Sequence, residues 1–405
     1  MNPSYNKHPQ GLKENWQQFT LLVIVNAFVG GMVGMERSIF PQFAHEQFGI
    51  ESTSAFLSFI TAFGISKALA NYIAGIFANR HGRRILLIWG WVLALPVPFI
   101  LISTLHWHWV VFANILLGVS QGLTWSSTVV MKIDLVGEKN RGFAMGINEF
   151  AGYLSIGLTA LLTGWIAQKY GTSPYPFVIG IVLSILGFAF SVIWVNETNQ
   201  FNAAEIKDTD NEIPVKSVFW ETTIKNRGLS AVTQAGMINN LNDGMIWGLL
   251  PIFLLQLQFS DTQIGWSAAI YPAVWGFGQL FTGSWADKFS IKQLLFWGML
   301  LQGIGLLILP MATNFVSVIT ISATLGFGTA MVYPTFLTAI AKNTSAIHRA
   351  ESIGTFRLWR DLGYALGAII SGILADRIGI GGSISVVALL TIFSAIIIKY
   401  RFPSK

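Results

Sequence analysis

Eight ionisable side chains interrupt long apolar stretches of this chain. They are Glu36, Arg37, Lys67, Glu149, Asp243, Arg357, Arg360 and Asp361. An ionised group at the centre of an apolar layer such as a bilayer costs at least about 2.5–3.5 kcal/mol, so each must be paired, hydrated or functional. Carboxylates can bind and release protons, and lysine and arginine can bind anions. Four cations against four acids indicate pairing rather than a strongly charged pore.

Glu149 and Arg357 occupy equivalent positions in an internal repeat whose offset is 208 residues. Counted from Arg141 and Arg349, which the same offset relates, both lie about 12 Å along their helices at about 1.5 Å per residue. They therefore lie at equivalent depths. Two interpretations stay open: Glu149 takes part in a structural salt bridge, or it binds and releases a coupling proton.

A second charged cluster follows Arg357. Arg357 and Asp361 are four residues apart, so they share a helix face and are predicted to pair. Arg360 is then the cation left over and the better candidate for contact with a solute. Lys67 either binds an anion or stays uncharged through burial.

Asp243 stands in a polar run, Asn239-Asn240-Leu241-Asn242-Asp243-Gly244, within an otherwise apolar stretch. A polar interruption of an apolar span is costly in lipid. This run therefore predicts a water-lined stretch or an unwound turn with a role in binding solute or protons. Glu36 and Arg37 are neighbours and cannot face the same way on a helix. We expect them to act in gating or at lipid headgroups.

Aromatic and amide side chains accompany these charges. The repeat relates Trp125 to Tyr333, and flat rings beside amides suit a small organic solute with flat and polar parts. The predicted solute-binding residues are Lys67, Gln121, Trp125, Asn148, Asn239, Asn240, Tyr333, Arg357 and Arg360. The predicted proton-coupling or gating residues are Glu36, Arg37, Glu149, Asp243 and Asp361. We predict no metal and no cofactor, because His106 and His108 lie in a Trp-rich segment typical of a membrane interface.

Composition indicates what must position these residues. The chain is 53% hydrophobic and 11% charged, with a mean hydropathy of +0.58, which is typical of a membrane protein. Nearly continuous apolarity argues against the alternating strands of a β-barrel. We expect an all-α protein with twelve transmembrane helices, near residues 18–41, 53–79, 83–105, 109–131, 141–168, 174–196, 228–257, 263–286, 291–311, 314–341, 351–376 and 381–399.

The net charge of +6 has a topological explanation. Most Lys and Arg residues fall in loops on one side, so both termini and the middle loop are predicted to be cytoplasmic in a multi-pass protein of a bacterial-type cytoplasmic membrane. The lipid bilayer, rather than nucleic acid, is then the partner of this basic chain. The polar first 17 residues show no cleaved signal peptide. With zero cysteines, disulfides and thiol metal sites are excluded.

The repeat predicts two similar halves. Arg141, Gly146, Gly164 and Gly171 recur at the same offset as Arg349, Gly354, Gly372 and Gly379. Residues 197–227 are too polar to pack. We therefore predict six-helix bundles at 1–196 and 228–405, joined by a cytoplasmic linker at 197–227. Within the linker, Val218 to Ile224 is either a short helix on the membrane surface or an ordinary pre-span segment.

Paired loops carry a resemblance to a known family. The first contains Gly75, Asn79, Arg80, Gly82, Arg83 and Arg84, and the second contains Gly283, Asp287, Lys288 and Lys292. This pattern, after the second span of each half, resembles the signature of the major facilitator superfamily. Asn79 departs from it, because that position usually carries an acid, and Asn114 stands where many proton-driven drug exporters of the family carry Arg. The resemblance implies twelve helices in two pseudo-symmetric bundles, with spans five and eleven lining a central cavity.

The function expected from these observations is secondary transport. Our leading hypothesis is proton-coupled export of a small organic solute by alternating access, carried out by a monomer. An organic-anion or metabolite carrier that uses Lys67, Arg357 and Arg360 is the alternative. A channel, or a membrane receptor or scaffold that does not transport, is a hypothesis of another class. An enzyme is not expected, because no catalytic motif stands inside a span.

Overall fold

The computed structural model describes residues 10–136, 141–198, 218–283, 285, 289–344 and 346–403, and these residues form helices without strands. The first half contains α1 (Trp16–Arg37), α2 (Phe40–Phe48), α3 (Thr53–Phe56), α4 (Ser58–His81), α5 (Arg83–Ala94), α6 (Pro96–Ser103), α7 (Trp107–Val136), α8 (Arg141–Tyr170) and α9 (Tyr175–Ile193). The second contains α10 (Val218–Trp220), η4 (Glu221–Lys225), α11 (Arg227–Gln256), α12 (Asp261–Thr282), α14 (Ile291–Ile308), η5 (Leu309–Met311), α15 (Phe315–Asn343) and α16 (Ala346–Arg401).

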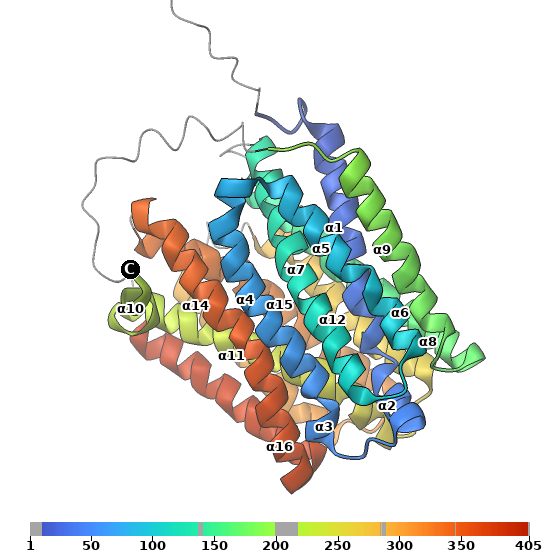
Figure 1. Ribbon diagram of the computed structural model, residues 1–405. Coiled ribbons are helices and arrows are strands. Elements are labelled where there is room, and N and C mark those ends of the chain that lie inside the picture. The colour runs from blue at the N-terminus through green and yellow to red at the C-terminus, as the bar shows by residue number, and fades with distance from the viewer. Residues whose placement is uncertain are drawn as a thin grey trace, which may run out of the picture.

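Long helices form a bundle, as Figure 1 shows. Eight described segments are long and apolar enough to cross a membrane, and one of them, Ser352–Arg401, is long enough to cross twice. Its backbone bends at Gly379, whose positive φ of 79° suits glycine. The helices α7, α11 and α12 add further passes, although each carries polar residues that lower its hydropathy. Among the described residues the twelve predicted passes are thus present, and the fold class is confirmed.

Several passes are broken rather than straight. The first span continues from α1 into α2 across Ser38 and Ile39, and the third divides into α5 and α6 at Leu95. Pro96 begins α6. Its backbone nitrogen carries no hydrogen, so it cannot donate the hydrogen bond that a continuous helix would need. These breaks explain why the predicted apolar runs are longer than some of the helices.

Two helix pairs join the halves. In the first pair α8 packs on α12. In the second pair α4 packs on the first part of α16, and these two helices lie side by side in Figure 1. Both contacts need glycine. A Cβ at Gly157 would lie 2.7 Å from the carbonyl oxygen of Ala269, and one at Gly64 would lie 2.9 Å from the amide nitrogen of Ala365. The small residues therefore let the backbones of the two halves approach closely.

The polar run in the seventh span does not unwind, so of its two predicted forms the unwound turn is wrong. The helix α11 is continuous from Arg227 to Gln256. The amide of Asn242 donates to Gln302 at 3.2 Å and its oxygen accepts from Thr391 at 2.7 Å. Neighbouring helices thus satisfy the side chain of Asn242 while the helical backbone stays intact, although Oδ1 of Asn239 in the same run is buried without a partner among the described residues.

The middle segment is described only at its two ends. Residues 199–217 of the predicted linker lie outside the described residues. From Val218 the chain forms α10 and the short π-helical η4, and then enters α11 at Arg227. Trp220 and Ile224 are 51% and 55% exposed. This segment therefore presents apolar side chains on its outer surface while Val218 is buried.

Candidate solute site

A pocket lies between the halves, enclosed by side chains from α4, α7, α8, α15 and α16. Its lining residues are Lys67, Asn71, Trp125, Ser126, Val129, Glu149, Tyr153, Tyr333, Arg357, Arg360 and Asp361. The structure thus brings together most of the ionisable groups that we predicted, along with Trp125 and Tyr333. Three cations face two carboxylates, so the pocket has a formal excess of one positive charge when all five are ionised.

Glu149 is held by neutral donors. Its Oε1 accepts hydrogen bonds from the indole of Trp125 at 2.9 Å and from the amide of Asn148 at 3.1 Å. Its Oε2 is buried and has no hydrogen-bond partner among the described residues. No ion pair joins Glu149 to Arg357 in the described part of the chain. The carboxyl group is therefore fixed at one oxygen and available at the other.

The charged cluster of α16 pairs differently from the prediction. Asp361 contacts its neighbour Arg360 at 3.5 Å rather than Arg357, and the guanidinium of Arg360 lies 4.5 Å from the ring centroid of Tyr333. The other oxygen of Asp361 accepts from Asn71 of α4 at 2.7 Å, which crosses between the halves. Because Asp361 turns toward α4, the predicted pair with Arg357 does not form.

Two cations of the pocket form neither hydrogen bonds nor ion pairs in the described structure. Arg357 and Lys67 line the pocket, and neither makes a hydrogen bond or an ion pair with a described residue. The ammonium group of Lys67 lies 5.7 Å from the ring centroid of Phe63 and 6.0 Å from that of Trp125. Such contacts with ring faces are attractive but leave the donors of the ammonium group free. Arg357, rather than Arg360, is thus the unpaired arginine of the cluster.

A row of aromatic rings crosses from one half to the other. Trp125 packs edge-on against Tyr153 with 5.3 Å between centroids, Tyr153 lies against Trp275 at 3.6 Å, and Trp275 meets Tyr333 at 5.8 Å. Sequence reasoning missed Tyr153. Its position four residues after Glu149 places it on the same helix face, which was an available signal.

Other predicted residues lie outside this pocket. The carboxylate of Asp243 accepts a hydrogen bond from Tyr271, while Gln121 donates to the carbonyl of Val29 at 2.9 Å. The remaining members of this group are buried but do not line the pocket: Asn148, Asn239 and Asn240. Sequence reasoning also missed Lys132, which is fully buried and donates to the carbonyl of Leu22 at 3.1 Å. It follows directly after a predicted span, and that boundary concealed it.

Contacts between the halves join them at one end of the molecule. We call these contacts the outer seal, because the topology predicted from the sequence places this end outside the cytoplasm. Asp376 of α16 accepts from the backbone amides of Thr53 and Ser54 at 2.7 and 3.0 Å, and from the hydroxyl of Ser52 at 3.1 Å. Arg360 lies about 24 Å along α16 from this end, at about 1.5 Å per residue. The seal therefore lies well beyond the pocket.

A second contact of the outer seal joins α8 to α12. The hydroxyl of Thr262 donates to the side-chain oxygen of Gln168. Partial burial raises the pKa of the neighbouring Asp261 above its usual value, and the carboxylate of Glu46 on the other half raises it further. The seal thus brings two acidic groups near each other across the halves.

Glu36 and Arg37 are buried between the pocket and the outer seal. The guanidinium of Arg37 lies among three rings, 5.5 Å from the centroid of Phe63, 5.4 Å from Trp247 and 5.8 Å from Tyr364. Trp247 and Tyr364 belong to the second half, so an arginine of the first half is inserted between the halves. The carboxylate of Glu36 is 3.5 Å from the amide of Asn114. Neither side chain lies at a headgroup position, since they are 1% and 3% exposed.

At the opposite end of the molecule, two glycines have open space beside them. A Cβ at Gly146 of α8, or at Gly354 of α16, would meet no atom within 4 Å. The repeat relates these two glycines, and each lies near the beginning of a helix that lines the pocket. Neither glycine is therefore in close contact with a helix of the other half, unlike Gly157 and Gly64.

The first signature loop fastens helix ends within one half. The backbone amides of Arg83 and Arg84 both donate to the carboxylate of Glu197 at 3.1 Å, and the guanidinium of Arg83 pairs with Asp134. Gly82 connects α4 to α5 with φ of 90°. The remaining predicted loop residues are described only in part: Asp287 and Lys288 lie outside the described residues, as do the side chains of Gly75, Asn79 and Arg80, while Gly283 ends α12.

A twelve-pass helical membrane protein with a polar pocket between two halves has the architecture of a secondary transporter. The model of the Major Facilitator Superfamily matches residues 22–241 and 232–405. The chain therefore belongs to the Major Facilitator Superfamily, and it is a multi-pass membrane transporter. The recognition made from the paired loops is confirmed.

Characterised relatives are distant. The proton-coupled antiporter flippase LtaA of Staphylococcus saprophyticus is 22% identical, covering 90% of this chain and 88% of that protein. The multidrug resistance protein MdtG of Proteus mirabilis is also 22% identical, covering 96% and 98%. A crystal structure of a POT family transporter in complex with a thioalcohol-conjugated peptide shares the fold, with a TM-score of 0.76, 13% identity and 95% of each chain covered.

Proposed function

We propose that this transporter exports a small organic anion across the cytoplasmic membrane in exchange for protons. The observation that carries the proposal is the pair of cations, Lys67 and Arg357, that line the pocket without a hydrogen bond or an ion pair to a described residue. Unpaired charge in an enclosed site is costly, and an anionic group of the solute would relieve that cost. Arg357 can bind such a group with two parallel hydrogen bonds, and Lys67 with one more.

The two ends of the molecule support alternating access. The outer seal joins the halves through Asp376 and Ser54 and through Thr262 and Gln168, whereas Gly146 and Gly354 face open space at the other end. On this proposal the moving bodies are residues 1–196 and 228–405, and residues 197–227 link them on the cytoplasmic side. The described state is then the one that receives solute from the cytoplasm.

Glu149 is the proposed proton carrier. One of its oxygens has no hydrogen-bond partner among the described residues, and it lines the same pocket as Arg357. A carboxylate beside a bound anion is unfavourable, so protonation of Glu149 and occupancy by the solute are coupled. Asp243, bonded to Tyr271 in the second half, is a second candidate for protonation. The relative LtaA is named a proton-coupled antiporter flippase, which agrees with this exchange.

The aromatic row favours a second candidate function, export of flat organic compounds. Trp125 and Tyr333 line the pocket together with Tyr153. Rings of this kind bind planar solutes with little dependence on charge. The relative named as a multidrug resistance protein agrees with this function. The two proposals differ in whether Arg357 is needed.

A thermal-shift screen of the purified protein tests the proposal. The library contains organic anions, cations and neutral planar compounds of similar size. We expect anions to raise the unfolding temperature, and Arg357→Gln to weaken their binding about ten- to hundredfold, because a hydrogen bond to a charged group contributes about 1.5–3 kcal/mol. Arg377→Gln, in the middle of α16 beside the outer-seal residue Asp376, is the matched control and leaves binding unchanged. Stabilisation by cations or neutral compounds alone, unaffected by Arg357→Gln, contradicts the anion proposal.

A further inference from the structure

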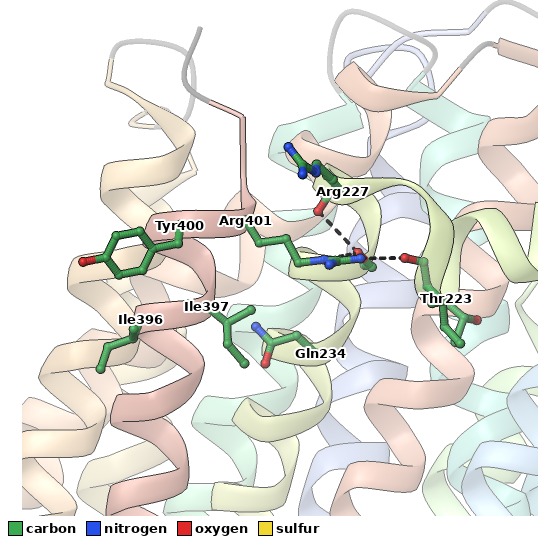
Figure 2. Close-up of a pocket in the computed structure, with 9 residues that line it drawn as sticks. Thr223, Arg227, Gln234, Ile396, Ile397, Tyr400 and Arg401 are labelled. Carbon is green, nitrogen blue, oxygen red and sulfur yellow. Dashed lines mark hydrogen bonds between the residues drawn. The ribbon is translucent and has the colours of Figure 1, made fainter.

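A second pocket, which we call the α11–α16 pocket, lies on the outside of the second half at the end opposite the outer seal. Its volume is about 640 Å³. It is formed by η4, the beginning of α11 and the end of α16, and Figure 2 shows its lining. The lining residues are Thr223, Ile224, Arg227, Ser230, Gln234, Ile396, Ile397, Tyr400 and Arg401. It is separate from the solute pocket, with which it shares no residue.

Two arginines provide the charge of the α11–α16 pocket. Arg401 is held in place, because it donates to the hydroxyl of Ser230 at 2.8 Å and to the carbonyl of Ile224 at 2.7 Å. The side chain of Arg227 is exposed and makes no hydrogen bond or ion pair with a described residue. No acidic residue is among the described residues that line the pocket. An anion bound there would meet two guanidinium groups and no carboxylate.

The rest of the pocket is apolar and faces outward. Ile396 is 42% exposed and Tyr400 is 81% exposed, and Ile397 lies beside Gln234 below the arginines in Figure 2. Trp220, on the turn just before η4, is 51% exposed. Exposed tryptophan and tyrosine beside arginine are typical of the boundary between hydrocarbon and headgroups. The pocket therefore combines a cationic rim with an apolar floor at the end of the last membrane pass, where lipid headgroups are expected.

We propose that the α11–α16 pocket binds one anionic phospholipid from the leaflet on the signature-loop side of the membrane. Its phosphate lies between Arg227 and Arg401, and its acyl chain runs along Ile396 and Ile397. Arg401 ties the end of α16 to η4 and to α11, so a lipid held there would join the same elements. A soluble phosphate would make no contact with the exposed isoleucines. The positive charge of the rim favours an anionic headgroup over a zwitterionic one.

Native mass spectrometry of the full-length protein in detergent tests this site. The protein is titrated with phosphatidylglycerol and, separately, with phosphatidylcholine. We expect phosphatidylglycerol to bind more tightly, and Arg227→Gln to weaken its binding roughly fivefold, which corresponds to the loss of one basic residue near a lipid surface. Phosphatidylcholine binding stays unchanged. Arg377→Gln, the same charge change in the middle of α16 just before its bend at Gly379, leaves phosphatidylglycerol binding as it is.

The choice of variant matters for the outcome. Arg401→Gln removes hydrogen bonds of the fold as well as charge, so Arg227→Gln carries the conclusion and Arg401→Gln only adds to it. Equal binding of the two lipids, or unchanged phosphatidylglycerol binding in Arg227→Gln, overturns the proposal. Displacement of phosphatidylglycerol by soluble glycerol phosphate at a similar concentration overturns it as well, because the acyl chain would then contribute nothing.

Discussion

Glu149 illustrates at the level of one residue how the pocket could serve both solute and proton. Two neutral donors, Trp125 and Asn148, hold one oxygen, while the other lacks a partner among the described residues. No arginine or lysine forms an ion pair with it in the described part of the chain. A carboxyl group held by neutral donors can change its protonation without breaking a salt bridge, which suits a proton carrier.

Replacement of Glu149 tests this role. Glu149→Gln keeps the size and the hydrogen bonds from Trp125 and Asn148 but cannot exchange a proton. We expect the initial rate of anion transport in proteoliposomes to become independent of an imposed pH gradient, whereas the wild-type rate follows the gradient. Glu51→Gln, at an exposed position between α2 and α3, is the control. A Glu149→Gln protein whose rate still follows the gradient removes Glu149 from the coupling mechanism.

Individual residues also show the limit of sequence reasoning. Spacing placed Arg357 and Asp361 on one helix face, but it could not show that Asn71 of α4 turns Asp361 toward the other half. That contact joins residues 290 positions apart. The depth of each residue along its helix could be counted from the sequence. This count placed Glu149 and Arg357 at equivalent depths, and both residues line the same pocket. Whether they pair depends on rotation about the helix axis, which the count does not give.

At the level of the helices, a glycine lets α11 and α16 of the second half approach each other closely. A Cβ at Gly363 of α16 would lie 3.0 Å from the carbonyl carbon of Met237 on α11, and nearer still to its oxygen. In contrast, Gly354 on the same helix has open space around it. The repeat singled out Gly354 in the sequence. The sequence alone could not show which glycines contact the backbone of another helix, because the register between two helices is a property of the tertiary structure.

These two glycines give a matched pair of substitutions. Gly363→Ala is expected to lower the free energy of unfolding by about 1–3 kcal/mol, since the methyl group must displace the backbone of α11. Gly354→Ala is expected to be neutral or slightly stabilising, because alanine favours a helix by about 1 kcal/mol over glycine. Unfolding temperatures of both variants in the same detergent measure the difference. Equal temperatures would show that the α11–α16 contact tolerates a side chain.

The whole molecule was predictable in outline. The lengths of the apolar runs predicted the spans, because each run must match the thickness of a bilayer. The internal repeat predicted two similar halves. The closed end was not predictable. Ser54 and Asp376 are 322 positions apart, and on the proposed alternating access the seal that they form belongs to one of two states. One sequence encodes both states, so it cannot indicate which contacts are made in either.

The central claim is that the halves alternate, and a reversible lock across the outer seal tests it most directly. The chain has zero cysteines, so the double substitution Gln168→Cys and Thr262→Cys introduces the sole possible disulfide. Each single substitution serves as a control. The measurement is transport of an anion identified by the thermal-shift screen, in proteoliposomes, before and after reduction. We predict no transport while the pair is oxidised and recovery on reduction; wild-type transport by the oxidised protein would contradict alternating access.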